Sequence, residues 1–583
     1  MTEDLNPVKP PRSRRRTWLF RLLAIFLSLS LLLLFEIGLR VFGVGADLAL
    51  IIPHPSGADW YQLNPRFDQP YFGRGDLSGP EPQPFRLPKP VGTRRILVVG
   101  GSTVIGFPYA SELAFPRQLQ ILLSQQAGSG ERIEVLNAGI TALNSSTELD
   151  VVKAGLRAEP DVIVVYTGHN EFYGPGGTAS SGSWLSPSGF RAIAEIRKLY
   201  FSQMMLRLTR SSAAPGNLME SLPSDLHIGL DSETFLTTVA RFAENLSAMA
   251  RWASDAGIPI VFVSPVANEH DQPPIEDVST AALEPDEDAW RRQRQRGQDE
   301  LEWGDVARAI ELLEAAKAER EHDPLVNFRL AQAYEQVGQK AAASVYYRAA
   351  LDLDGCRFRA PSAMRRTMRE VAQRHTSGGA RFLDLHATFC ESERSGVPGR
   401  KHFLEHVHFT GEGNQFVAES IARMLWQDVW SKSWSPERSL DAATLRERLA
   451  AQAEDDLAAR AMTLLIYQKP PFRDGADAPL LAKKVVSDSI SRFRVLPLER
   501  QKLFEQLSSA DMSGDLISVL VQSAKTQQLD ELYGRWLAAR VIRKPWQSQT
   551  RSELVDWLRA HGRVSDADQI QADAQVWPSG EGR

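Results

Sequence analysis

Short apolar runs that alternate with amphipathic segments constrain the fold of this 583-residue chain more than any other feature. The run RILVVG is continuously apolar after its arginine, which is typical of a strand that is buried on both faces of a sheet. Between the runs, apolar residues recur at helical spacing. The pattern predicts an α/β fold in three layers, a parallel sheet with helices on both faces, whose strands lie at 95–100, 132–139, 161–168, 258–265 and 380–386.

The strand pattern is interrupted at residues 285–357, where only helical spacing is present. Residues 324–353 fit the 34-residue register of a tetratricopeptide repeat (TPR), and stepping back 34 residues from Tyr347 reaches Leu313, which also fits. We expect one well-matched repeat and one partial repeat; a generic helical hairpin is the alternative. Because the sheet pattern resumes afterwards, this all-α segment is predicted to be an insertion within one α/β domain.

The N-terminal part of the chain differs from the rest. An apolar run from Thr17 to Gly43 covers 27 residues, enough for a tilted helix across a hydrocarbon core of about 30 Å. Arginines at 12 and 14–16 precede the run, and such residues stay on the cytoplasmic side. We expect an uncleaved transmembrane anchor, with the following chain outside the cytoplasm. A cleaved signal peptide is the alternative, but the run is long for one and no small-residue cleavage site follows closely.

These patterns divide the chain into successive segments. They are a basic cytoplasmic tail (1–16), a transmembrane anchor (17–43), an extended proline-rich lead-in (44–93), the first part of the α/β domain (94–284), the TPR-like helical insertion (285–357), the second part of the α/β domain (358–432) and a C-terminal helical region (437–583). The last segment shows helical spacing but no chemical motif.

Charge and cysteine content exclude several classes of function. The formal net charge is −5, which argues against a nucleic-acid partner. The only cysteines, Cys356 and Cys390, are too few for a zinc cluster or a disulfide-dense scaffold. A bridge between them would join the end of the insertion to the fifth strand, and the sequence leaves open whether it forms.

Residues that can take part in catalysis, such as serine, histidine, asparagine and glutamate, follow the carboxyl ends of the predicted strands. In chain order the ends carry GGST, NAGI and TGHNE, and EHVHFTGEGN precedes the last helix of the α/β domain. In sheets of this kind the carboxyl ends of the strands hold the chemistry. Together with the anchor and the TPR-like insertion, these blocks resemble membrane-anchored bacterial members of the SGNH (GDSL-type) hydrolase superfamily, over residues 90–430.

The resemblance implies a serine hydrolase site, block by block. It makes Ser102 the nucleophile, His408 the base that accepts its proton, and Glu405 the acid that orients the base. It also implies an oxyanion hole formed by the backbone of Ser102 and Gly139 and by the side chain of Asn170. It implies neither a metal nor an organic cofactor.

Two residues depart from the pattern of the superfamily. The aspartate that usually precedes the nucleophile is Gly101 here, and the usual aspartate of the triad is Glu405. The first change leaves the triad intact and bears on the substrate class. The second keeps the charge and lengthens the side chain by one carbon. His402 and His406 lie close to His408, but the register of the block favours His408 as the base; three further polar residues are expected to line or support the site, His169, Glu171 and Asn144.

The expected function is that of a serine esterase or O-acyltransferase. The resemblance implies a single-pass protein of the bacterial inner membrane, with its catalytic domain in the periplasm and an acyl ester, on a glycan, as substrate. The alternative is an envelope scaffold whose TPR-like insertion binds a protein partner and whose α/β domain has little turnover. The joint presence of Ser102, Glu405, His408 and Asn170 favours the enzyme.

Overall fold

A parallel sheet lies at the centre of the computed structural model, which describes residues 14–57, 59–72, 79–180, 186–209, 226–276 and 285–578. Its strands are β4 (Thr93–Gly100), β5 (Arg132–Gly139), β6 (Val162–Tyr166), β7 (Ile260–Val263) and β8 (Ala380–Leu383). All five predicted strands are present, in the order β5-β4-β6-β7-β8. The chain passes from β4 out to β5 and then back to β6, so the winding reverses beside the carboxyl end of β4. Ligands bind at such a reversal in open α/β sheets.

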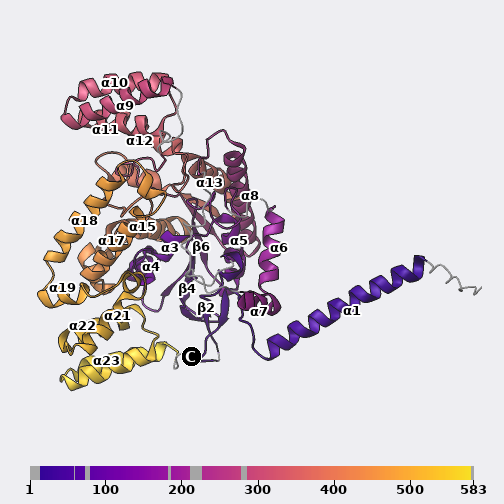
Figure 1. The fold of residues 1–583 in the computed structure, drawn as a ribbon. Helices are drawn as coiled ribbons and strands as arrows, with labels where there is room; N and C mark the ends of the chain where they lie inside the picture. Colours follow the sequence, from indigo (N-terminus) through magenta and orange to yellow (C-terminus); the bar gives the residue numbers. More distant parts are fainter. Residues whose placement is uncertain are drawn as a thin grey trace, which may run out of the picture.

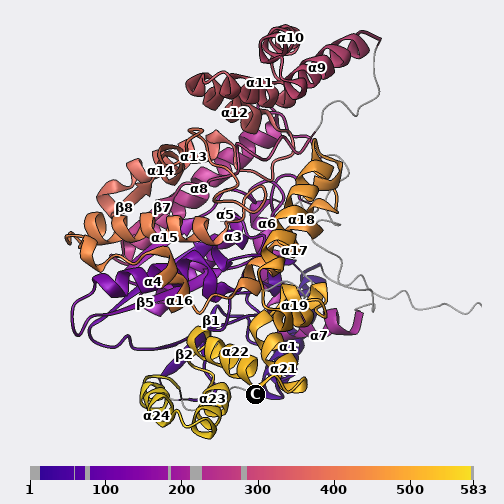
Figure 2. The same cartoon turned by 90° about the vertical axis from the view of Figure 1, so that its left-hand side faces the viewer.

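Helices cover both faces of this sheet (Figures 1 and 2). On one face α4 (Phe115–Gln126) and α15 (Gly411–Met424) pack with Ile96 and Val98 of β4. On the other face Leu97 and Val99 pack with the remaining helices of this layer, α5 (Ser145–Gly155), α8 (Glu233–Asp255) and α13 (Ser362–Arg374). Burial on both faces explains the continuous apolar runs and confirms the α/β class with a parallel sheet.

The lead-in differs from the extended segment that its composition predicts. It forms an antiparallel sheet of β1 (Ile51–Pro53), β2 (Trp60–Leu63) and β3 (Pro84–Arg86), with a single helical turn, α2 (Gln69–Phe72). The fully buried guanidinium of Arg95 in β4 donates to the carbonyl of Arg86 at 2.9 Å and to Glu134 at 2.5 Å, so it ties the two sheets together. Strands of three or four residues near prolines carry too little alternation to be recognised from sequence.

After β7, the described chain forms four helices in two successive hairpins before it reaches α13. They are α9 (Pro285–Trp303), α10 (Val306–Glu319), α11 (Pro324–Gln336) and α12 (Lys340–Leu353). Figures 1 and 2 show them stacked at one end of the molecule, beyond α13. Leu313 in α10 and Tyr347 in α12, which are 34 residues apart, are both buried. Helices α9–α12 thus lie in the chain between β7 and β8 of the central sheet.

The C-terminal region is helical and packs against the α/β domain (Figure 2). The hydroxyl of Tyr467 donates to Gln272 at 2.9 Å, and Lys544 Nζ lies 2.8 Å from Glu81 and 3.3 Å from Glu112. A separate apolar core surrounds Trp536. The helices of the region are α16 (Ala442–Arg448), α17 (Ala453–Tyr467), α18 (Ala478–Arg494), α19 (Leu498–Phe504), α20 (Ser509–Ser513), α21 (Leu516–Thr526), α22 (Asp530–Arg543), α23 (Ser548–Ala560) and α24 (Val564–Asp573).

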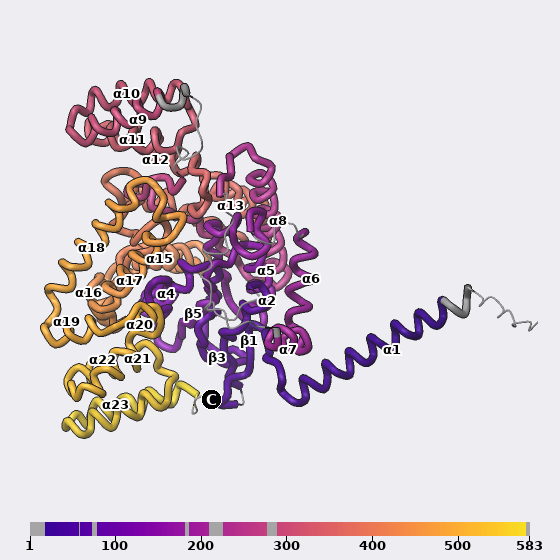
Figure 3. Tube along the Cα trace, in the orientation of Figure 1, coloured from indigo at the N-terminus to yellow at the C-terminus, as the bar shows by residue number. Residues whose placement is uncertain are grey.

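Helix α1 (Arg14–Val41) projects away from the rest of the molecule (Figures 1 and 3). Its segment Trp18–Val41, 24 residues, is long and apolar enough to cross a membrane. Helices α6 (Pro187–Arg197) and α7 (Tyr200–Thr209) follow β6 in the chain, and α7 lies at the base of α1 (Figure 3).

The two cysteines are free thiols. Cys356 is buried just after α12, and Cys390 is half-buried in α14 (Leu385–Ser392). The disulfide that the sequence leaves open therefore does not form.

Candidate active site

Ser102 begins the short helix α3 (Ser102–Ile105), directly after β4. The two preceding glycines are required by close packing. A side chain at Gly100 would collide with the carbonyl of Tyr166, and a Cβ at Gly101 would lie 2.8 Å from Asn170 Nδ2. A side chain at position 101 would therefore require the Asn170 amide group to shift. Glycine at both positions lets the serine lie at the carboxyl end of β4, beside the end of β6.

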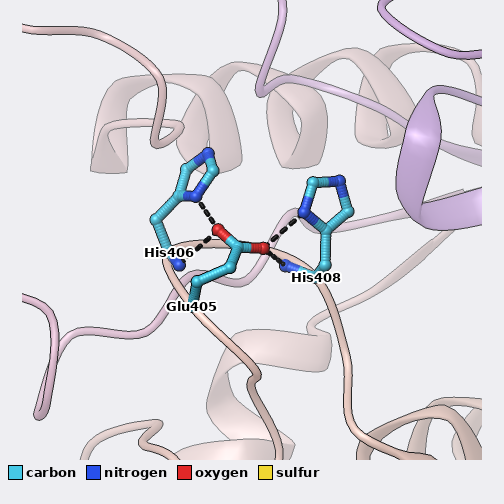
Figure 4. A group of neighbouring side chains, drawn as sticks. All are labelled: Glu405, His406 and His408. Atoms are coloured by element: carbon cyan, nitrogen blue, oxygen red, sulfur yellow. Dashed lines mark hydrogen bonds and ion pairs between the residues drawn. The ribbon is translucent and has the colours of Figure 1, made fainter. Parts of the chain in front are cut away.

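His408 comes to Ser102 from a loop that lies 306 residues further along the chain, and its Nε2 is 2.8 Å from Ser102 Oγ. Its other ring nitrogen, Nδ1, contacts Glu405 (Figure 4). In the Nδ1–H tautomer the imidazole donates to the carboxylate and leaves Nε2 free to accept the proton of the serine hydroxyl. Ser102, His408 and Glu405 thus form a hydrogen-bonded chain with the order of a serine hydrolase triad.

The loop that carries Glu405 is built to hold the carboxylate. The backbone amide of His408 donates to one oxygen at 2.9 Å and that of His406 to the other at 2.6 Å. The loop closes on itself, since the amide of Leu404 donates to the carbonyl of His408 at 2.8 Å. Glu405 is buried, with 1% of its surface exposed. These amide donors stabilise its negative charge without solvent.

The imidazole of His408 is buried, and burial favours its neutral form. The ring of Phe107 meets it edge-on, with centroids 4.8 Å apart. Burial lowers the pKa of His408 to about 3. A neutral imidazole is the form that can accept a proton from Ser102.

Of the three groups predicted as oxyanion donors, two are available for a further hydrogen bond and one is not. Asn170 Nδ2 uses one hydrogen to bond the carbonyl of Leu143 at 2.9 Å, which leaves the other available. The Ser102 amide, in the first turn of α3, has no hydrogen-bond partner among the described residues. The Gly139 amide, in contrast, donates to Asn137 Oδ1 at 3.0 Å and is not available to a substrate.

The predicted role of Gly139 as a donor is therefore corrected to a packing role. A Cβ at Gly139 would collide with the backbone of Ile105, so this glycine lets β5 and α3 approach each other. Three residues later Ala142 has a left-handed backbone, with φ of 62°, beside Leu143. Its amide has no partner within the described parts of the chain. The sequence does not predict a left-handed backbone at position 142, because alanine rarely adopts a positive φ.

Two further histidines lie around the triad. His406 Nδ1 contacts the second oxygen of Glu405, and burial lowers the pKa of His406 well below its usual value. Burial and the neighbouring His408 lower the pKa of His169 to about 3. His169 Nδ1 accepts a hydrogen bond from the Ala360 amide at 3.2 Å, and His169 Nε2 lies 3.3 Å from the Tyr166 hydroxyl. Both ring nitrogens therefore have partners outside the Ser102–His408–Glu405 chain. His402 instead pairs with Glu393 at 2.6 Å.

A second layer of polar residues supports the loop that carries Leu143. Glu171, next to Asn170 in sequence, accepts from the amide and the hydroxyl of Ser145 at 2.9 and 2.6 Å. Asn144 caps the N-terminus of α5 in a capping box with Thr147. The supporting roles expected for Glu171 and Asn144 agree with these contacts.

Glu405, His406 and His408 also have the residue types of a metal site, with ligand atoms within 4.8 Å of one another. However, Glu405 already faces both Nδ1 atoms (Figure 4). A metal ion held by these three residues would separate Glu405 from His408 and remove the acid from the triad. The residues therefore fit a hydrogen-bonded triad better than a metal centre.

Comparisons with known proteins add little to this geometry. No protein-family model matches the chain, and no curated protein matches it. A solved structure, "Crystal structure of the lipase/acylhydrolase from Enterococcus faecalis", is similar over 57% of this chain and 95% of its own, with 14% sequence identity and a TM-score of 0.25. A likeness of this degree supports neither a family nor an activity.

Proposed function

We propose that this protein is a serine esterase or O-acyltransferase of the SGNH type. The observation that carries the proposal is the contact of 2.8 Å between Ser102 Oγ and His408 Nε2, with Glu405 on the opposite ring nitrogen. The position of Ser102 at the end of β4, beside the reversal of the sheet, also supports it.

In the proposed reaction Ser102 Oγ attacks the carbonyl carbon of an ester while His408 Nε2 takes the hydroxyl proton. Glu405 stabilises the imidazolium that results. The oxyanion accepts hydrogen bonds from the Ser102 amide and the free hydrogen of Asn170 Nδ2. His408 then returns the proton to the leaving alcohol, and an acyl-enzyme remains. Water or a sugar hydroxyl, deprotonated by His408, releases the acyl group.

The proposal extends to the cellular setting of this activity. Helix α1 suits a single-pass anchor, and the arginines before it favour an orientation with the catalytic domain in the periplasm. We propose a glycan acyl ester as the substrate class. The helices α9–α12, as TPR-like hairpins, are proposed as a surface for a protein partner.

Labelling with a fluorophosphonate probe tests the proposal directly. The purified full chain is expected to be labelled, and Ser102→Ala is expected to abolish both labelling and hydrolysis of a small acetyl ester. Ser188→Ala is a matched control, since Ser188 is exposed and lies in α6. Labelling that persists in Ser102→Ala would remove Ser102 as nucleophile. Absence of labelling in the unchanged protein would favour a scaffold, the alternative function.

A substrate screen separates hydrolysis from transfer. Acetylated glycans are offered with and without an acceptor glycan, and both free acetate and the acetylated acceptor are measured. An esterase yields acetate at the same rate in both cases. A transferase yields acetylated acceptor at the expense of acetate, because both products come from one acyl-enzyme.

A further inference from the structure

An acidic residue, Glu36, lies inside the membrane-length segment of α1. Its neighbours Phe35 and Ile37 are each 47% exposed, as expected of side chains that face lipid, but Glu36 is only 9% exposed. A carboxylate in the hydrocarbon region is costly unless its hydrogen-bond partners lie at the same depth. Five residues separate Glu36 from Val41, which places the carboxylate about 8 Å below the end of α1.

The partners of Glu36 come mainly from α7. The amides of Tyr200 and Phe201 donate to its two oxygens at 3.0 and 2.9 Å, and Arg40 Nε donates at 2.9 Å. The carboxylate therefore caps the N-terminus of α7, although the two helices are more than 160 residues apart in sequence. The first turn of α7 must therefore lie at the same depth in the membrane as the carboxylate of Glu36.

Further contacts hold α7 in one orientation against α1. The rings of Phe35 and Phe201 meet edge-on, with centroids 5.9 Å apart. On the opposite side of α7, Gln203 exchanges two hydrogen bonds with the backbone of Ala46, at 2.8 and 3.0 Å, and Arg207 donates to the carbonyl of Val44 at 2.9 Å. One side of α7 is thus tied to the chain that leaves α1.

The other side of α7 is apolar. Phe201, Met205 and Leu208 stand at positions i, i+4 and i+7, which form one stripe of a helix. Leu208 is 73% exposed and Met205 is also exposed. The stripe begins at Phe201, which contacts the lipid-facing Phe35, so it continues the apolar surface of α1.

We propose that α7 lies in the membrane–water interface on the non-cytoplasmic side of the membrane that α1 spans. The stripe Phe201, Met205 and Leu208 is then in contact with lipid. The proposal goes beyond the catalytic function and rests on α1 as the membrane anchor. Helix α7 follows α6, whose Arg197 donates to the carbonyl of Pro70 and whose Ala194 belongs to the core of the α/β domain. Insertion of α7 therefore holds the catalytic domain at the membrane surface in one orientation and restricts it to substrates near the bilayer.

Spin labels on the full chain test this placement. Cys356 and Cys390 are replaced by serine, and single cysteines are introduced as Leu208→Cys, Leu27→Cys in the middle of α1, and Val91→Cys in the lead-in. The proteins are labelled with a nitroxide and reconstituted in vesicles of phosphatidylethanolamine and phosphatidylglycerol. Collision of each label with oxygen, which dissolves in lipid, is compared with collision with a polar nickel complex, which remains in water. Thermal unfolding checks that each variant is folded.

We expect the oxygen-to-nickel ratio at position 208 to approach that at position 27 and to exceed that at position 91 by about tenfold, because polar complexes are excluded from hydrocarbon. A label at 208 that collides with nickel as freely as the label at 91 would place the stripe in water and overturn the proposal. Low collision with both reagents at 208 would show that protein covers it, which also overturns the proposal. Nickel access at position 27 would reject the anchor itself and α7 insertion with it, while fluorophosphonate labelling of Ser102 would be unaffected.

Discussion

The ring of Phe472 lies on the imidazole of His406, with centroids 4.4 Å apart, and His406 in turn contacts the carboxylate of Glu405. Phe472 belongs to the C-terminal region, between α17 and α18, and it also packs against Phe358, 5.5 Å away between centroids. The C-terminal region carries no chemical motif, but its Phe472 contacts His406, and His406 contacts Glu405, the acid of the proposed triad. This contact predicts that the region helps to position Glu405.

Phe472→Ala is expected to lower kcat by about tenfold, because small displacements of a catalytic group are costly, and to reduce the free energy of unfolding by about 3–5 kcal/mol through the cavity it leaves. Both are measured on detergent-purified protein, by ester hydrolysis and by denaturant unfolding. Phe493→Ala, in α18, is the control and should reduce stability without lowering kcat. An unchanged kcat in Phe472→Ala would show that the C-terminal region does not position the acid.

Glu405→Gln should lower kcat on the order of 10³–10⁴, because a neutral amide neither fixes the Nδ1–H tautomer of His408 nor stabilises the imidazolium. The change is nearly isosteric, so the fold and the KM should be little affected. Glu412→Gln serves as control, since Glu412 is exposed and lies seven residues further along the chain. Activity within tenfold of the unchanged protein would exclude Glu405 as the acid of the triad.

The pH profile should show that His408 is neutral over an unusually wide range. A histidine in water becomes protonated below about pH 6.5, and a protonated base cannot accept the proton of Ser102. Because burial lowers the pKa of His408 to about 3, kcat/KM should remain high as the pH falls through 6.5 and decline only well below it. The measurement is kcat/KM for a neutral acetyl ester between pH 4 and 8, over the range where circular dichroism shows folded protein. An acidic limb centred at about 6.5 would contradict the buried state of the base.

Asn170→Ala should lower kcat by about 10²–10³ with little change in KM, as expected for loss of one oxyanion donor. Asn137→Ala is the matched control, because Asn137 donates to the carbonyl of Val104 and accepts from the Gly139 amide. Its loss should mainly reduce thermal stability. Equal losses of kcat in the two variants would mean that Asn170 acts through the fold and not on the oxyanion.

Chelation distinguishes the triad from a metal centre at Glu405, His406 and His408. Prolonged dialysis against a chelator should leave both ester hydrolysis and fluorophosphonate labelling unchanged, since the proposed reaction uses Glu405 as a hydrogen-bond acceptor of His408. Metal content is measured before and after dialysis. Loss of activity that returns on addition of zinc would instead favour a metal-dependent hydrolase.

The sequence by itself determined the class of fold and the positions of the residues proposed for catalysis. The central strands β4, β6 and β7 can be predicted from sequence, because a strand that is buried on both faces needs a continuous run of apolar residues. The motifs around Ser102 and His408 are only a few residues long, so they can be recognised from the sequence alone. The helical insertion was visible because its period differs from that of a strand.

Only the tertiary structure decided how these segments meet. Gly139 illustrates the limit: its place in the motif was clear, but the direction of its amide depends on the side chain of Asn137. The contact of Phe472 with His406, and the cap that Glu36 provides for α7, join residues far apart in the chain. Such contacts leave no periodic pattern in either partner, because each depends on where the rest of the chain brings the other. Packing, not local propensity, therefore decided the surroundings of the site and the contact between α7 and α1.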